Sequence, residues 1–547
     1  MNLLFVLLTA MVASMVLIPF MIRLAPHIGM VDQPDERKVH LKPIPRVGGI
    51  GIVLGTLLAI IIWLPQDSFL WSYLLGSLVL FVFGALDDSF ELGHYVKFIG
   101  QFIAVGIIVF AGDVRVEHIP FLDSPLSEYA SKSFSFIAIV GVINAINHSD
   151  GLDGLAGGES LLSLACLAYL AIMIDEANSA QLLIMIFAVI GGILGFMRFN
   201  NHPAQIFMGD AGSQFLGYSL AIFTIILTQK VHTSVSMALP VLILGLPIVD
   251  ILAVFVQRIY HGMNWFRASK NHIHHRLLEL GFDHYQSVII IYSVQVLLVL
   301  CAVNFRYASD GLVMGLYLII CGSLFLALYV SEKNNWNFGS DGNKSRLTNF
   351  VDSLREKKLF TEGPLILLKL LIPAYFIIGS VLITSISTDF VIELAVIGFV
   401  LILSWIIKRS DFSTYLVRIG IYAMAVIMVY LLDQQVIPES GWLYYIDIVF
   451  FAVLSVTVAV VVRYARQINF SVTPFDYLMV VLVIAAGIVQ QNYGSDLALG
   501  YIVIKSVILF YGCEVAVNNR KSDAGNLLGA ASLVAAAVLL FKVAATQ

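Results

Sequence analysis

The segment Asn144–Gly158, NAINHSDGLDGLAGG, combines amides, carboxylates and glycines between two apolar runs of the sequence. It carries Asp150 and Asp153, but no Lys or Arg that would neutralise them. Like charges at this spacing repel each other, so the arrangement is costly unless a cation or a polar ligand binds there. The glycines of the segment allow a tight turn and a close approach of the backbone to a ligand. The segment therefore predicts a binding turn.

Other short polar segments between apolar runs carry further carboxylates and histidines. Asp87 and Asp88 follow one apolar run, and Asp210 lies between two others. A later polar segment contains three histidines, namely His272, His274 and His275. Paired aspartates at a helix end are also typical of a solvated cap, and clustered histidines of a solvated loop. The histidines favour zinc only weakly, because no companion Cys/His pair is present.

Composition predicts where these residues lie. The chain has 547 residues, of which 59% are hydrophobic and 12% charged, and its mean hydropathy is +0.91. A soluble protein cannot bury that much apolar surface, and the apolar runs are continuous rather than alternating. We therefore predict an all-α polytopic membrane protein with about 18 transmembrane helices of about 20 residues each. The four cysteines fall in apolar runs and show no metal-ligand spacing.

The distribution of positive charge predicts the orientation of the chain. Most of the 31 Lys and Arg residues fall in alternate loops, which places these loops inside and both termini outside. The acidic segments and the histidine cluster then share the inner face. Clustered carboxylates at a membrane face suit Mg²⁺, which binds one or two carboxylates together with phosphate oxygens. Neutralising a diphosphate in this way is most of what phosphoryl transfer requires.

Lys97 and Asp250 are among the ionisable residues that lie within apolar runs. Lys97 lies in the run Tyr95–Ala111, where a free ammonium is expensive, so a partner is expected. Snorkelling of the side chain to the membrane surface is the alternative. Asp250 lies near the inner end of the predicted span Val235–Val256, where either a functional or a helix-end role is plausible.

Four motifs together resemble those of the polyprenyl-phosphate N-acetylhexosamine-1-phosphate transferases. They are DDSFE at Asp87, the segment at Asn144, PAQIFMGDAGS at Pro203 and HIHH at His272. The family is related to the enzymes that start lipid-linked O-antigen and teichoic acid synthesis, and to the phospho-MurNAc-pentapeptide transferase. The resemblance covers about residues 3–303. It implies transfer of a sugar 1-phosphate from a UDP-N-acetylhexosamine to undecaprenyl phosphate at the cytoplasmic face of a bacterial inner membrane, with release of UMP.

The resemblance also implies roles for individual residues. Mg²⁺ is the implied cofactor, with Mn²⁺ as the alternative, and its ligands are Asp210 and Asp150. Asp87 and Asp88 resemble the pair that deprotonates or positions the lipid phosphate. The residues implied to bind the substrates are Lys97 at the lipid phosphate, Asn144, Asn147 and Asp153 toward the nucleotide and diphosphate, Phe207 near the uracil, and His272, His274, His275 and Arg276 at the diphosphate or sugar.

The sequence departs from the family pattern in the histidine segment. The chain reads NWFRASKNHIHH where many bacterial members carry an SPF-type segment. The second histidine position is Ile273, which favours the hexosamine branch over the muramyl-pentapeptide branch. Whether transfer takes one step or passes through a phosphosugar on a carboxylate is open.

The chain is expected to divide into a ten-helix core at 1–330, a cytoplasmic connector at 331–363 and a C-terminal block of transmembrane helices at 364–547. The C-terminal block is either a scaffold for partners or the carrier of a second activity. For the whole chain, the alternative to an enzyme is a transporter or lipid flippase that uses the carboxylates to bind cations or protons. Besides its two substrates, the protein is expected to contact membrane lipid. Nucleic acid is not expected, and a homodimer is compatible with the resemblance.

Overall fold

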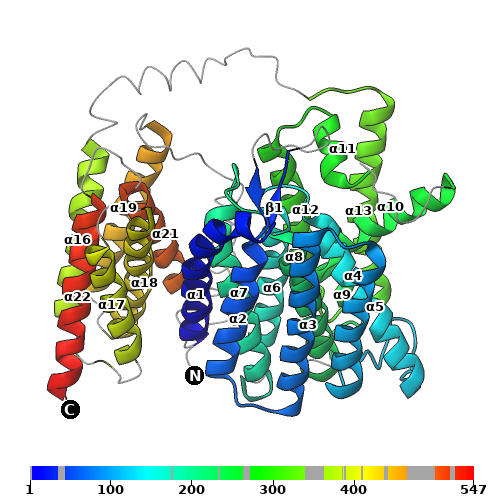
Figure 1. The fold of residues 1–547 in the computed structure, drawn as a ribbon, viewed down its shortest axis with the longest axis horizontal. Coiled ribbons are helices and arrows are strands. Elements are labelled where there is room, and N and C mark those ends of the chain that lie inside the picture. The colour runs from blue at the N-terminus through cyan, green and yellow to red at the C-terminus, as the bar shows by residue number, and fades with distance from the viewer. Residues whose placement is uncertain are drawn as a thin grey trace. The chain divides into compact units, whose positions relative to one another are not determined.

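The computed structural model describes most of the chain, which forms two compact units (Figure 1). The first unit ends at residue 338 and the second begins at residue 363, so most of the expected connector at 331–363 lies outside the described residues. The described residues are 3–34, 43–173, 176–231, 234–262, 271–338, 363–384, 386, 390–407, 411–435, 442–464, 499–517 and 524–546.

The first unit is helical apart from one short strand pair. Its helices are α1 (Leu3–Leu24), α2 (Gly48–Trp63), α3 (Ser68–Phe90), α4 (His94–Gly106), α5 (Glu128–Ser149), α6 (Leu155–Ile172), α7 (Glu176–Asn200), α8 (Gly209–Ile226), α9 (Leu239–Ile243), α10 (Gly245–Tyr260), α11 (Ile273–Glu279), α12 (His284–Asn304) and α13 (Asp310–Lys333). Short 3-10 or π turns extend α1, α4 and α8 at Ala25–His27, Ile107–Ala111 and Leu227–Val231.

The prediction of an all-α polytopic membrane protein is confirmed. Among the described residues, 13 helices are long and apolar enough to cross a membrane, and the shorter helices Gly48–Trp63 and Val391–Ile406 are also apolar. The predicted number of about 18 spans is not confirmed. The boundary predicted near residue 330 falls within α13, which runs to Lys333.

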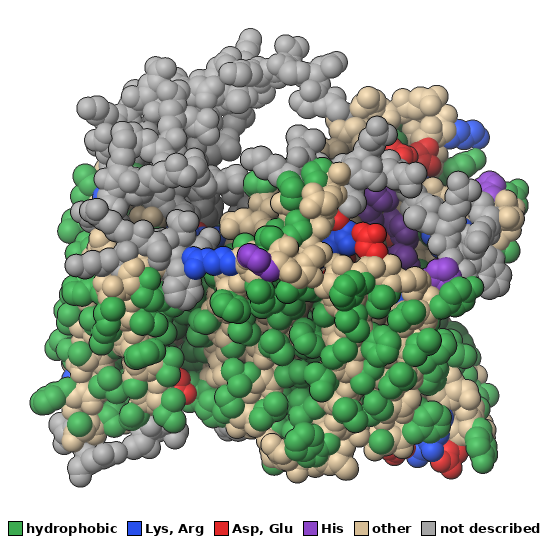
Figure 2. Space-filling view, viewed as in Figure 1, with side chains coloured by type: hydrophobic (Ala, Val, Ile, Leu, Met, Phe, Trp, Pro, Cys, Tyr) green, Lys and Arg blue, Asp and Glu red, His purple; other side chains and the backbone are tan. Residues whose placement is uncertain are grey.

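One face of α3 shows why these helices suit a lipid environment. Its exposed large side chains follow a helical spacing of three and four residues, namely Trp71, Leu75, Leu78, Val82 and Leu86. The opposite face buries Tyr73, Ser77 and Leu80. In Figure 2, hydrophobic side chains cover the lower part of the first unit, whereas acidic, basic and histidine side chains gather in a hollow above them. The first unit therefore has an apolar belt with a polar site near one end.

Helix α8 lies at the centre of the first unit, because 94% of the residues in its most apolar stretch are buried. It packs against α2, α3, α5, α6 and α7. Glycines permit the closest approaches. A Cβ on Gly84 of α3 would lie 2.5 Å from the Cα atom of Ala211, and one on Gly49 of α2 would lie 2.2 Å from the backbone nitrogen of Gly212. The start of α8, which carries Asp210, is therefore held directly against α2 and α3.

We predict that Gly49→Ala destabilises the protein, because its methyl group would collide with the backbone of α8 and neither helix can move freely. Overpacking of this kind costs about 1–3 kcal/mol. The thermal midpoint of the protein in detergent measures the effect. Gly141→Ala in α5 is the matched control, since its methyl group would meet nothing within 4 Å. An unchanged midpoint for Gly49→Ala would contradict this account of the α2–α8 contact.

Two local features differ from the prediction. The single span predicted at Val235–Val256 is broken into α9 and α10 at Leu244. Pro247 has no backbone N–H to donate to the preceding turn, which removes one helical hydrogen bond at this position. The loop after α1 forms a two-residue antiparallel strand pair, β1 (Val31–Asp32) with β2 (Ile44–Pro45), which the sequence analysis did not anticipate.

The second unit contains only helices among its described residues. They are α16 (Gly363–Leu382), α17 (Val391–Ile406), α18 (Asp411–Gln435), α19 (Trp442–Tyr464), α21 (Leu499–Val517) and α22 (Ala524–Thr546). Helix α21 packs against α16, α18, α19 and α22. The core of this unit consists of large apolar side chains such as Phe376, Leu394 and Leu509.

Candidate active site

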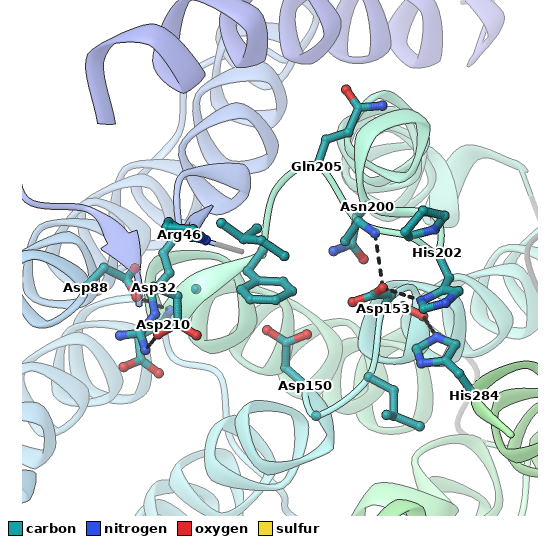
Figure 3. A pocket seen from close by; sticks show the side chains of 18 of the residues that line it. Asp32, Arg46, Asp88, Asp150, Asp153, Asn200, His202, Gln205, Asp210 and His284 are labelled. Atoms are coloured by element: carbon teal, nitrogen blue, oxygen red, sulfur yellow. Dashed lines mark hydrogen bonds and ion pairs between the residues drawn. The ribbon is translucent and has the colours of Figure 1, made fainter. Parts of the chain in front are cut away.

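A cavity of about 1000 Å³ opens at the polar end of the first unit. It is lined by the β1–β2 pair, by the turn between α5 and α6, by the turn between α7 and α8, and by the start of α12 (Figure 3). Seven of the residues predicted from the sequence line it, namely Asp88, Asn147, Asp150, Asp153, Phe207, Asp210 and His275. The motifs are far apart in the sequence, so the fold brings them together.

Lys97 lies between two of the predicted carboxylates, one of which, Asp210, lines this cavity. Its Nζ is 2.8 Å from Oδ2 of Asp210 and 3.3 Å from Oδ2 of Asp87. Burying a lysine in a membrane helix is unfavourable unless the ammonium group has such partners. The two carboxylates supply the partners that the sequence predicted. Asp87 does not itself line the cavity, but it is linked to it through Lys97.

Asp210 is held in one orientation by contacts to both of its oxygens. The amide nitrogen of Asn147 donates to Oδ1 of Asp210 at 2.5 Å and to the hydroxyl of Ser213 at 2.8 Å, while Lys97 binds Oδ2. Asp88 accepts hydrogen bonds from the backbone nitrogens of Asp210 at 2.9 Å and Ala211 at 3.1 Å. A carboxylate at a helix N-terminus is favoured by the free N–H groups and the helix dipole. Asp88 therefore fixes the start of α8.

Asp150 lies between the two ends of the cavity (Figure 3). Burial, followed by the negative charges of Asp210 and Asp153, raises the pKa of Asp150 to about 7. The repulsion inferred from the sequence is thus present in the folded protein, and it extends to Asp210. An excess of carboxylates around one cavity is the chemistry of a cation site.

The other end of the cavity is organised around Asp153. Its Oδ2 lies 2.6 Å from Nδ1 of His202 and accepts a hydrogen bond from the backbone nitrogen of Ala204 at 3.1 Å. Nε2 of His284 lies 3.2 Å from the backbone oxygen of Asp153, and the rings of His202 and His284 stack at 4.0 Å. Asp153, His202 and His284 offer atoms within 4.8 Å of one another that could also hold a metal ion. Figure 3 shows this group apart from Asp88 and Asp210.

The three predicted histidines occupy two different positions. His275 lines the cavity, whereas His272 and His274 lie behind the α5–α6 turn. A Cβ on Gly151 would lie 2.2 Å from Nε2 of His274, so this histidine packs against the backbone of the turn. Burial, with smaller effects of His275, His272 and His148, lowers the pKa of His274 to about 3. His274 is therefore neutral at physiological pH and supports the turn without a positive charge.

Asp250 holds the histidine segment in place. Its Oδ2 lies 2.8 Å from Nδ1 of His272, and its Oδ1 accepts from the backbone nitrogen of Ile273 at 2.9 Å. A carboxylate bound to one ring nitrogen fixes both the orientation and the tautomer of a histidine. The sequence analysis left Asp250 between a functional and a helix-end role, and the structure gives it this positioning contact.

Asn144 and Arg276 are among the predicted substrate-binding residues that do not line the cavity. The amide nitrogen of Asn144 donates to Gln101 at 2.8 Å, and Gln101 in turn donates to Gln214 at 3.2 Å. These amides join α4, α5 and α8 below the site. Arg276 forms a two-pronged ion pair with Glu332 at 2.6 and 2.9 Å, which directs it toward α13.

Several lining residues were not predicted from the sequence. Arg46 forms an ion pair with Asp32 across the β1–β2 pair, and both side chains line the cavity. His202 lies in a polar segment that was singled out only for Asp210, and His284 begins α12. Asn200 at the end of α7 accepts a hydrogen bond from the backbone nitrogen of Gly154 at 2.8 Å. Their sequence positions could have identified these residues, because each of them lies at the end of an apolar run.

Comparison with known proteins identifies the family of the chain. The family described as glycosyl transferase family 4 matches residues 70–228, which include the segments of Asp87, Asn144 and Asp210. A probable undecaprenyl-phosphate N-acetylglucosaminyl 1-phosphate transferase of Bacillus subtilis is 32% identical over 323 residues, which cover 58% of this chain and 88% of that protein.

Two further relatives match about half of the chain. An undecaprenyl-phosphate alpha-N-acetylglucosaminyl 1-phosphate transferase of Pasteurella multocida is 31% identical over 50% of this chain and 78% of its own length. A decaprenyl-phosphate N-acetylglucosaminephosphotransferase of Mycobacterium tuberculosis is 32% identical over 49% of this chain and 74% of its own length. The chain is a multi-pass membrane transferase that belongs to glycosyl transferase family 4.

Proposed function

We propose that this protein transfers N-acetylglucosamine 1-phosphate, or a closely related N-acetylhexosamine 1-phosphate, from a UDP-sugar to undecaprenyl phosphate and releases UMP. The observation that carries the proposal is that Asp210 and Asp150 line one cavity beside an apolar belt, while Lys97 contacts Asp210. A soluble nucleotide sugar and a membrane lipid phosphate each have access to such a site from their own phase. The names of the relatives from Bacillus subtilis and Pasteurella multocida give undecaprenyl phosphate and N-acetylglucosaminyl 1-phosphate, which supports the same acceptor and transferred group here.

Mg²⁺ is the metal that the donor set fits best, with Mn²⁺ as the alternative. The carboxylates of Asp210 and Asp150 would hold it, since hard divalent cations prefer oxygen ligands and leave room for phosphate oxygens. When bound, the metal would neutralise charge on the diphosphate. The repulsion that raises the pKa of Asp150 supports this assignment, because a cation would relieve it.

The chain's own residues would position the two substrates. Lys97 would pair with the lipid phosphate, in exchange for one of its carboxylate partners. Asp87, on the other side of Lys97, is available to accept or direct a proton of that phosphate. Asp153, fixed by His202 and Ala204, would contact the nucleotide. Phe207 and His275 also line the cavity and would border the uracil and the sugar or diphosphate.

The site is proposed to face the cytoplasm from a bacterial inner membrane, with both termini outside. The distribution of Lys and Arg supports this orientation. The transporter alternative is less well supported, because it requires acids near the middle of the membrane. Asp87 and Asp88 lie in the last turn of α3, and Asp210 lies in the first turn of α8.

A transfer assay with the purified protein tests the proposal. Undecaprenyl phosphate is incubated with a panel of radiolabelled UDP-N-acetylhexosamines, and label in the organic phase is counted with and without Mg²⁺. We expect Mg²⁺-dependent transfer from at least one of these donors. Label in the lipid fraction that does not depend on the divalent ion would overturn the metal assignment, and no transfer from any donor would overturn the function.

The pKa of Asp150 leads to a prediction about pH. A carboxyl group whose pKa is raised to about 7 is largely protonated below that pH and ionised above it. The ionised fraction falls about tenfold for each pH unit well below the pKa. We therefore expect the apparent affinity for Mg²⁺ to rise between pH 6 and pH 8. Mg²⁺ titrations of activity at both pH values measure this, and Asp150→Asn should abolish the difference. The same pH dependence in Asp150→Asn would assign it to another group.

A further inference from the structure

The C-terminal unit contains two groups of charged side chains at opposite ends of the same helices. Helices α18 and α19 each include a stretch long and apolar enough to cross a membrane, and α21 packs against both (Figure 1). Ionisable residues in such helices are expensive to bury and are retained mainly where they act. The catalytic cavity of the first unit uses none of them. They therefore need a separate explanation.

The first group, here called the Lys505 cluster, consists of Asp433, Asp447 and Lys505. Nζ of Lys505 lies 2.7 Å from Oδ2 of Asp447 and also contacts Oδ1 of Asp433. The side chains of Asp433 and Asp447 are 8% and 6% exposed, and that of Lys505 is 12% exposed. One residue comes from each of three helices, near the end of α18 and near the starts of α19 and α21.

The second group lies toward the other end of α18 and α21 and differs in its charge. Arg418 lies 3.3 Å from Glu514, and the hydroxyl of Tyr422 also donates to Glu514. In these described contacts one cation faces one carboxylate, and this one-to-one balance makes the group an internal comparison for the Lys505 cluster.

The Lys505 cluster has two carboxylates for one ammonium. In the part of this unit that the structure describes, neither carboxylate is paired with another Lys, Arg or His. Tyr375 of α16 faces both carboxylates, and Lys542 of α22 instead donates to backbone oxygens of α16 and the residue after it. With all three groups ionised, one negative charge would remain in a medium of low dielectric. Such a charge is stable only when a positive charge joins it.

We propose that the Lys505 cluster is a membrane-buried proton-binding site, in which Asp433 or Asp447 holds one proton taken from water while Lys505 stays charged. A metal cation fits less well, because the ammonium already lies between the carboxylates. A hard cation also needs several further oxygen ligands. The described neighbours are aromatic: the Phe451 ring lies 5.9 Å from Nζ, and Tyr375 stacks on Phe450 at 5.0 Å.

Proton release from this site would weaken the packing of three helices at once. It restores the unmatched negative charge between α18, α19 and α21, which then favours entry of water or separation of these helices. The C-terminal unit therefore carries a proton-responsive element of its own. This role is independent of sugar-phosphate transfer and does not rest on the function proposed above.

Infrared difference spectroscopy of the full-length protein in lipid nanodiscs tests the proposal. Spectra of Asp433→Asn and Asp447→Asn are subtracted from the wild-type spectrum at pH 7, in the region of the carboxylic-acid C=O stretch. We expect at least one variant to lose a carboxylic-acid band that is sensitive to deuterium. Glu514→Gln is the matched control, because it removes a carboxylate from the balanced pair and should lose no such band. Sugar-phosphate transfer should be unchanged in both aspartate variants.

Thermal stability gives a second readout that does not depend on band assignment. Asp447→Asn leaves one carboxylate with one ammonium, so its melting temperature should equal or exceed that of the wild type. Lys505→Met leaves two carboxylates without a cation and should lower it. If both aspartate variants keep every carboxylic-acid band of the wild type, the proposal is overturned. A band that appears in the wild type only after Na⁺ and K⁺ are removed would also overturn it, in favour of a metal cation.

Discussion

Replacing Asp210 by asparagine is expected to lower kcat for sugar-phosphate transfer on the order of 10³-fold. Asp210 faces the cavity at the start of α8, and Lys97 and Asn147 fix its two oxygens. The amide keeps the shape of the side chain but removes the charge that would hold a divalent cation. Initial rates at saturating UDP-sugar and lipid phosphate measure the effect. The melting temperature is measured alongside, because the substitution removes one of the two carboxylate partners of Lys97.

Asp113→Asn is the matched control for this substitution. Asp113 is largely exposed, pairs with Arg115 and has a positive φ that asparagine also adopts readily. Its activity should equal that of the wild type. If Asp210→Asn retains most of the wild-type kcat while Mg²⁺ is still required, another residue must hold the metal.

Replacing Lys97 by glutamine is expected to reduce kcat/KM for the lipid phosphate by about 10²-fold. Removing one charge-assisted hydrogen bond costs about 1.5–3 kcal/mol. The loss should appear mainly in KM for undecaprenyl phosphate, and much less in KM for the UDP-sugar. The substitution also leaves Asp87 and Asp210 without their shared cation, so we expect a lower melting temperature.

A second lysine provides the control for Lys97. Lys132 lies in an i,i+4 pair with the exposed Glu128 on α5, and pairs of this kind contribute little. Lys132→Gln should leave both KM values unchanged. A Lys97→Gln enzyme that loses affinity for both substrates equally would indicate a general collapse of the site. An unchanged KM for the lipid would show that Lys97 does not contact it.

Much of the site was predictable because its chemistry is concentrated in short polar segments. Asp150 stood out between apolar runs, and the structure places its carboxylate in the same cavity as Asp210. Lys97 was predictable for the opposite reason, since a buried cation demands a partner. In both cases a charged side chain in or beside an apolar segment is unfavourable without a partner, so the sequence predicted a contact with a residue elsewhere in the chain. The partners themselves, including Asn147 on Asp210, follow only from the packing of α5 against α8.

The missed residues owe their roles to tertiary structure alone. Arg46 lies in a charged, proline-containing segment that is typical of a membrane anchor, and only the β1–β2 pair brings it to Asp32 at the cavity. His202 and His284 are 82 positions apart. Neither belongs to a recognisable motif, and they meet because the ends of α7 and α12 meet beside Asp153. Arg276 is the opposite case: it was predicted to bind substrate because it follows the histidine motif, but in the structure it pairs with Glu332.

The helices were more predictable than their interruptions. Continuous apolar runs of the sequence coincide with helices α1, α3 and α12. The break between α9 and α10 depends on the backbone at Leu244 and on Pro247, whose effect competes with a strongly apolar run. Hydropathy does not predict this helix break, because proline changes backbone hydrogen bonding more than it changes the polarity of the segment.

The central claim is that one cavity in the first unit joins a nucleotide sugar to a lipid phosphate. The most direct measurement follows UMP release and lipid-linked sugar diphosphate formation in the same reaction, with the purified wild-type protein and Asp210→Asn. We predict one UMP for each lipid product in the wild type, dependent on both undecaprenyl phosphate and Mg²⁺, and neither product with Asp210→Asn. UMP release without undecaprenyl phosphate at the full rate, or equal product formation by Asp210→Asn, would contradict it.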